Sequence, residues 1–178
     1  EDDHTEDEHE DDEGGRDPHI WMDPENGRII ARNMRDALVE AAPEYRESFE
    51  SNYDDLIDRI DALDRELSEI LRPLEGSTLF VFHPSFGYFA DAYGLEQEAI
   101  ETGGKEPSAR DLVGIIEKAK EEGVKVIFVQ PQFSMRAAET VAEAIGGAVV
   151  PIDPLAENWL ENLRRIGKTV RDELGGPE

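Results

Sequence analysis

The sequence predicts an α/β fold: a four-stranded, mainly parallel sheet flanked by helices, together with one long helix. Two patterns support this prediction. From residue 78 onward, short apolar runs alternate four times with helical patterns. Residues 44–71 contain neither proline nor glycine and repeat apolar side chains every three or four positions. Strands that alternate with helices across short loops are typical of a parallel sheet.

Two helices are expected ahead of the sheet. Asp23 can cap the first one and Pro24 suits its first position. Its expected apolar face comprises Ile29, Ile30, Met34, Ala37, Leu38 and Ala41. The second helix, over residues 44–71, would be roughly 40 Å long at 1.5 Å per residue. Its apolar stripe comprises Phe49, Tyr53, Leu56, Ile60, Leu63, Leu67 and Ile70. The same stripe meets the minimum for a coiled coil, so a coiled-coil interaction module is an alternative.

The alternating part of the chain predicts four strand–helix units. Strands are expected at residues 78–82, 95–100, 124–129 and 148–152. Helices are expected at residues 85–93, from Ser108 to just before Gly123, from Ser134 to just before Gly146, and from Trp159 through Val170. Ser108 with Asp111 is the pattern of a helix start, and the glycines are typical helix ends.

The composition is strongly acidic. The chain has 178 residues, a net charge of −25 and no cysteine, which excludes disulfides and thiolate metal ligands. Such a charge disfavours nucleic acid and anionic membranes as partners. Residues 1–15 form an acidic low-complexity segment that predicts a disordered loop. Its two histidines, His4 and His9, leave open weak collection of divalent cations.

Candidate ligands follow from the predicted sheet. Ligands bind at the carboxyl ends of parallel strands, and the first polar residues past those ends are His83, Gln130 and Asp153. His19 would join them if its segment follows a strand outside this chain. Two imidazoles and one carboxylate suit Zn²⁺ or, with more oxygen ligands, Mn²⁺ or Fe²⁺. Spacing alone leaves a plainer interpretation open, in which the histidines are hydrogen-bonded strand-end residues and Asp153 starts a turn.

Catalytic motifs are absent. The sequence has no Gly-x-Ser-x-Gly, no phosphate loop and no Gly-x-Gly-x-x-Gly. A metallohydrolase with one metal position open to water is an alternative, although no motif places a general base beside the histidines. The sequence therefore favours a binding protein over an enzyme.

Four segments resemble one family. They are "DPHIWMDPENGRIIARNM", "FVFHPSFGYFADAYGL", "EPSARDLVGIIEKAKEEGVKVIFVQPQFS" and "IDPLAENWLENL". Together they resemble the solute-binding proteins of zinc and manganese ABC importers, most closely the zinc-uptake type (cluster A-I or cluster 9). The family fold has two α/β lobes joined by a long rigid helix, with metal bound between the lobes. The resemblance implies that residues 16–72 are the end of the first lobe and the linker helix, and that residues 73–178 are the C-terminal lobe.

The resemblance also implies a site and a role. His19, His83 and Asp153 match metal-ligand positions, and histidine rather than glutamate at position 83 favours Zn²⁺. The implied function is extracytoplasmic capture of the metal, in the periplasm or at the cell surface, for an ABC permease. The chain is then expected to be a monomeric C-terminal portion, with a first lobe and any lipid anchor encoded upstream. Mn²⁺ or Fe²⁺ importer components and adhesin-type relatives are the alternatives. Without the first lobe, residues 1 to about 22 are expected to be mobile.

Overall fold

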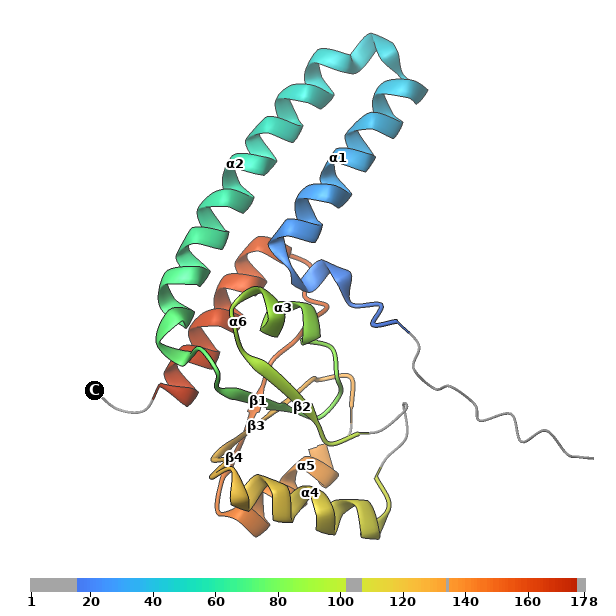
Figure 1. Ribbon diagram of the computed structural model, residues 1–178. Helices are drawn as coiled ribbons and strands as arrows, with labels where there is room; N and C mark the ends of the chain where they lie inside the picture. Colours follow the sequence, from blue (N-terminus) through green and yellow to red (C-terminus); the bar gives the residue numbers. More distant parts are fainter. Residues whose placement is uncertain (1–15, 102–106, 134, 176–178) are drawn as a thin grey trace, which may run out of the picture.

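The computed structural model describes residues 16–101, 107–133 and 135–175, and it confirms the α/β class (Figure 1). The strands are β1 (Thr78–Val81), β2 (Glu96–Ala99), β3 (Val126–Val129) and β4 (Ala148–Pro151). They form one sheet in the order β2-β1-β3-β4, with every neighbouring pair parallel. Two predictions, the acidic segment 1–15 and a helix start at Ser134, lie outside the described residues.

The helices surround this sheet. Their bounds are α1 (Pro24–Ala41), α2 (Arg46–Leu71), α3 (Gly87–Ala92), α4 (Ala109–Glu121), α5 (Met135–Ile145) and α6 (Trp159–Leu174), with short 3-10 turns η1 (Ile20–Met22), η2 (Pro43–Tyr45) and η3 (Arg72–Leu74). The Asp23 side chain accepts a hydrogen bond from the N–H of Glu25 and caps α1, as predicted. Ser108 and Asp111 form the predicted capping box of α4. None of the helices in the described ranges is both long and apolar enough to cross a membrane.

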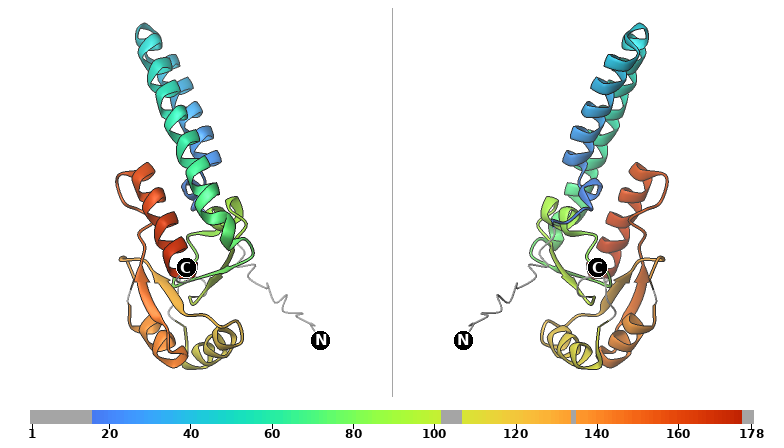
Figure 2. Two further views of the ribbon diagram at one scale, coloured as in Figure 1. Left: turned by 90° about the vertical axis from the view of Figure 1, so that its left-hand side faces the viewer. Right: turned by 90° about the vertical axis from the view of Figure 1, so that its right-hand side faces the viewer.

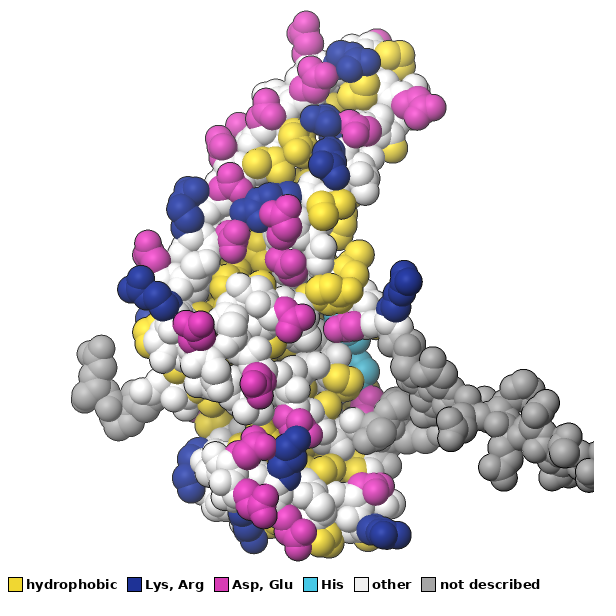
Figure 3. All heavy atoms as spheres, in the orientation of Figure 1, with side chains coloured by type: hydrophobic (Ala, Val, Ile, Leu, Met, Phe, Trp, Pro, Cys, Tyr) yellow, Lys and Arg dark blue, Asp and Glu magenta, His cyan; other side chains and the backbone are white. Residues whose placement is uncertain are grey.

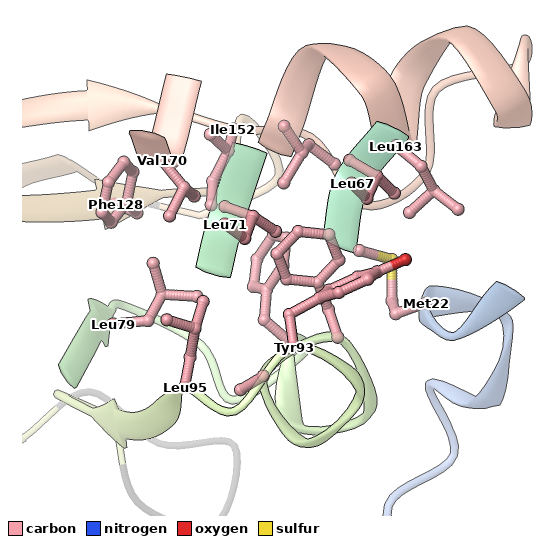
Figure 4. Packing of buried hydrophobic residues seen from close by; sticks show 14 of the residues in the cluster. Met22, Leu67, Leu71, Leu79, Tyr93, Leu95, Phe128, Ile152, Leu163 and Val170 are labelled. Carbon is pink, nitrogen blue, oxygen red and sulfur yellow. The ribbon is translucent and has the colours of Figure 1, made fainter. Parts of the chain in front are cut away.

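Two hydrophobic clusters lie on opposite faces of the sheet. Helices α2, α3 and α6 contribute to the larger cluster on one face, and α4 and α5 cover the other (Figure 1). Figure 4 shows Leu67 and Leu71 of α2 between Leu163 of α6 and the side chain of Tyr93. The carboxyl-terminal half of α2 is thus part of the core, whereas its amino-terminal half projects with α1 as a helical hairpin beyond the sheet (Figure 2).

The burial of α1 differs from its predicted apolar face. The buried residues of α1 are Pro24, Gly27, Ala31 and Val39, whereas Met34 is 60% exposed and Leu38 is 46% exposed. Helical spacing tells which side chains share a face, but the neighbouring elements decide which of them are covered. Along α1 the main neighbour is α2, and the buried residues lie on a different strip of the helix from the predicted one.

The described segment before α1, residues 16–23, is packed against the lobe, in contrast to the mobility expected up to residue 22 for want of packing partners; residues 1–15 of that expectation lie outside the described residues. Met22 is fully buried in the larger hydrophobic cluster. The indole of Trp21 is partly buried, and its Nε1 donates a hydrogen bond to the carbonyl of Pro154 at 3.0 Å. Side chains of the C-terminal lobe therefore supply packing partners for Trp21 and Met22, although Ile20 is 42% exposed.

Candidate metal centre

The carboxyl ends of the four strands share one edge of the sheet, because all strands run in the same direction. Backbone pairing continues just past the strand ends: Glu101 N donates to Phe82 O at 3.0 Å, and Ile152 N donates to Val129 O at 2.9 Å. This pairing fixes the chain immediately around His83, Glu101, Gln130 and Asp153. The predicted edge therefore carries the expected side chains together with an additional acidic residue.

The imidazole of His83 has two contacts, one at a ring nitrogen and one on the face of the ring. Its Nδ1 lies 2.8 Å from Oε1 of Glu101, whose side chain is only 3% exposed. The ring of Phe133 stacks on the imidazole with centroids 4.6 Å apart. A buried carboxylate beside an imidazole nitrogen accepts that nitrogen's proton in a hydrogen bond, so the arrangement directs the other nitrogen, Nε2, away from Glu101.

The backbone of His83 is fixed by Gln130, which is fully buried. Oε1 of Gln130 accepts from the His83 N–H at 3.2 Å, and its Nε2 donates to the His83 carbonyl at 2.7 Å. The same Nε2 donates to Oγ of Ser85 at 2.9 Å. The sequence places Gln130 at the strand end, and the structure shows that it supports His83 through the backbone.

His19 precedes η1 and has its own carboxylate. Oδ1 of Asp17 accepts from the His19 N–H at 2.8 Å and lies 2.7 Å from His19 Nδ1. The ring of Trp21 meets the imidazole edge-on, with centroids 5.4 Å apart. His19 and His83 thus have the same local arrangement, in which Nδ1 lies beside a carboxylate and an aromatic ring touches the imidazole.

The structure brings His19 and His83 together across 64 positions of sequence. Their ring centroids lie 5.3 Å apart, with the ring planes at 81°. Figure 3 shows the histidine side chains at the surface, where the segment before α1 meets the lobe. Zn–N bonds are about 2.0–2.1 Å long, so two imidazoles at this separation are close enough to share one ion.

Asp153 lies at the same edge of the sheet, but its side-chain hydrogen bonds are with residues other than the two histidines. Its Oδ1 accepts from Nε2 of Gln132 at 2.8 Å and from the N–H of Leu155 at 2.9 Å. It also borders a cavity of about 350 Å³ together with Arg165 and Thr169. The described part of the chain holds no group of three or more acidic or histidine side chains arranged to bind a metal ion. The structure therefore pairs the two histidines, and Asp153 as their companion ligand stays a prediction.

Sequence reasoning missed Glu101 and Asp17. Glu101 follows β2 by two positions, as His83 follows β1, so the strand-end rule that selected His83 could also have selected Glu101. Asp17 gave a weaker signal, because only the fold shows that its carboxylate turns back onto the imidazole two residues later.

A third acidic residue, Asp23, is the last residue of the segment that carries His19, directly before α1. Burial raises the pKa of the Asp23 carboxyl above its ordinary value of 3.8, and the nearby Asp64 carboxylate acts in the same direction. The N–H of Glu25, which donates to Asp23, opposes that rise. Asp64 itself forms an ion pair with Arg28 at 2.8 Å, so the guanidinium of Arg28 compensates the negative charge of the Asp64 carboxylate.

These features define a class: an α/β lobe with two carboxylate-supported imidazoles at its strand ends is a candidate transition-metal-binding lobe. The family model described as "Zinc-uptake complex component A periplasmic" matches residues 1–172. The chain belongs to this family, the solute-binding proteins of zinc ABC importers. It is a family of metal-binding transport components rather than of enzymes.

Individual relatives agree with this assignment. The high-affinity zinc uptake system protein ZnuA of Brucella abortus (strain 2308) is 32% identical over 170 residues, which cover 90% of this chain and 51% of that protein. A crystal structure of ZnuA matches with a TM-score of 0.86 and 38% identity, over 88% of this chain and 62% of that one. A zinc-bound ZnuA deletion mutant matches with a TM-score of 0.85 and 36% identity, over 93% and 65%. The chain spans about half the length of the curated ZnuA relatives that it matches.

Proposed function

We propose that this chain is part of a protein that captures Zn²⁺ outside the cytoplasm and delivers it to the permease of an ABC importer. One observation carries the proposal: His19 and His83, from distant segments, lie with ring centroids 5.3 Å apart at the strand-end edge. The names of the family and its relatives support zinc as the cargo, and the family description supports a periplasmic location.

The carboxylates prepare the histidines for a metal. When Nδ1–H donates to Asp17 or Glu101, the neutral imidazole keeps a free electron pair on Nε2. Histidines that bind metals generally make this second contact, which fixes the tautomer and raises the basicity of the ligating nitrogen. No covalent step is required, and the protein acts by selective capture and release.

The donor set favours zinc among the divalent metals. Imidazole nitrogen suits Zn²⁺, whereas carboxylate, carbonyl and water oxygens suit Mn²⁺. Asp153 is the proposed carboxylate ligand, and its contact with Gln132 Nε2 holds one of its oxygens in place. We expect Zn²⁺ to displace Mn²⁺ or Fe²⁺ from the site, because those ions gain less from two imidazoles.

Calorimetric zinc titration of the full chain tests the proposal. The His83→Ala and His19→Ala variants should each lose the tightest binding event, since one imidazole alone holds the ion weakly. The matched control is a double variant, His4→Ala with His9→Ala, which removes the histidines of the acidic segment and should keep that event. Loss of tight binding in the control, with binding retained in His83→Ala, would show scavenging by the acidic segment and would overturn the proposal.

A further inference from the structure

Two tryptophans, 138 positions apart, each donate an indole hydrogen bond to a backbone carbonyl across the same contact. Nε1 of Trp159 donates to the backbone carbonyl of Trp21 at 2.7 Å. Nε1 of Trp21 donates to the carbonyl of Pro154 at 3.0 Å. Each indole therefore ties the segment that carries His19 to the β4–α6 region that carries Asp153.

The indole of Trp159 packs directly against Gly27 of α1. A Cβ built at this position would overlap Cη2 of Trp159 and would lie 2.8 Å from its Cζ2. Only a residue without a side chain lets the Trp159 ring lie against α1 this closely. The ring is thus held from one side by helix backbone and from its polar end by the Trp21 carbonyl.

Packing leaves open space beside the two rings. Trp21 and Trp159 both border an apolar cavity of about 280 Å³, together with Ile30, Met34 and Leu56. A side chain with open space beside it can move unless a directional contact holds it, and the indole hydrogen bonds are such contacts. The Trp21 ring also touches the imidazole of His19, so a shift of this indole reaches the candidate ligand directly.

We propose that Trp21, Trp159 and Gly27 form a clasp that positions His19 against His83, with Trp159 acting as a positioning residue through Trp21. The effect on metal affinity rests on the proposed function, whereas the placement of His19 does not. Breaking the clasp leaves both histidines in the chain but frees the segment that holds one of them.

Trp159→Phe tests the clasp, because it removes the indole N–H and keeps an apolar ring. The zinc dissociation constant should rise by about tenfold to a hundredfold, the range seen when groups that orient metal ligands are removed. In the metal-free protein, the imidazole NMR signals of His19, identified by their absence in His19→Ala, should shift. Gly27→Ala should give both effects while it keeps both indoles, because it displaces the Trp159 ring.

Tyr93→Phe is the matched control. It deletes another hydrogen bond of the core, from Tyr93 to Oδ1 of Asp64 at 3.1 Å, and should lower thermal stability without changing zinc affinity or the His19 signals. Unchanged His19 signals in both Trp159→Phe and Gly27→Ala would overturn the clasp. If wild-type zinc affinity proves independent of His83, the proposed function fails, but the metal-free spectra still decide whether the clasp positions His19.

Discussion

At the scale of single residues, Gln130 combines full burial with three side-chain hydrogen bonds. Its fully buried amide satisfies both backbone groups of His83 and the hydroxyl of Ser85. An amide is required there, since only it offers an acceptor and two donors on one short planar group. The backbone that carries a candidate ligand thus depends on the side chain that directly follows the neighbouring strand β3.

We expect Gln130→Ala to destabilise the protein by about 2–4 kcal/mol, because each buried polar group left without a partner costs about 1–3 kcal/mol. Urea unfolding measures this difference. Gln132→Ala is the control: Gln132 lies two residues further on, is exposed and should change stability by less than about 0.5 kcal/mol. Equal costs for the two variants would show that the contacts to His83 contribute little.

The site could be predicted from sequence only in part. His83 and Asp153 follow apolar strands, so a rule about strand ends is enough to select them. That His19 lies beside His83 could be expected from the family resemblance, since the spacing of 64 positions carries no geometric information. The roles of Asp17 and Glu101 depend on side-chain direction within hydrogen-bond distance, which no sequence period encodes.

At the scale of elements, the predicted strands agree with the observed ones to within two residues at each end. The agreement has a physical source: each predicted strand begins one or two residues after a glycine. Gly94 and Gly123 adopt φ of +69°, a conformation that ends a helix and that other residues rarely adopt. The exposed apolar side chains of α1 were not predictable in this way, because their exposure depends on which elements lie nearby.

Close contact between α2 and α6 yields a prediction about glycine. A Cβ at Gly167 of α6 would overlap Cδ2 of Leu67 in α2, whereas a Cβ at Gly114 of α4 would meet nothing within 4 Å. Gly167→Ala should therefore destabilise the protein by about 1–3 kcal/mol through overpacking. Gly114→Ala should stabilise it by up to about 1 kcal/mol through helix propensity. Thermal unfolding of the pair separates the two effects, and a stabilised Gly167→Ala would contradict the close packing.

Ion pairs also connect α2 and α6. Arg164 of α6 donates to Oε2 of Glu66 at 2.7 Å and lowers the pKa of that carboxyl below its ordinary value of 4.5. Lys168 lies 3.2 Å from the other oxygen of Glu66. An acid with a lowered pKa stabilises the fold above its ordinary pKa, and this contribution disappears as the pH falls through the lowered pKa.

Glu66→Gln should therefore lower the free energy of unfolding at pH 7 by no more than about 1 kcal/mol, since the pair is partly exposed. The difference from wild type should vanish in acid, once the wild-type carboxyl is protonated. Denaturant unfolding at several pH values measures it, with Glu69→Gln, at an exposed position of α2, as the control. A difference that stays constant down to strong acid would rule out the ion pair as its source.

At the scale of the whole molecule, the apolar stripe of α2 serves the protein's own core. Ile60, Leu63 and Leu67 are fully buried within the chain, so that half of the stripe is not available for a coiled coil with a second copy. We therefore expect the mass of one chain in sedimentation equilibrium at all concentrations tested. A mass that rises with concentration would contradict this, and Met34→Lys would then show whether the exposed side of α1 is responsible.

The contact between α2 and α6 also affects the order in which the chain can fold during synthesis. Glu66 and Arg164 are 98 positions apart, yet their helices share one core. During synthesis, the part of α2 that α6 covers, including Leu67, stays exposed until α6 has left the ribosome. We expect a polypeptide ending before Trp159 to lack a stable core. Until α6 is made, the larger hydrophobic cluster is incomplete, so we expect the nascent chain to be unfolded more easily than the finished one.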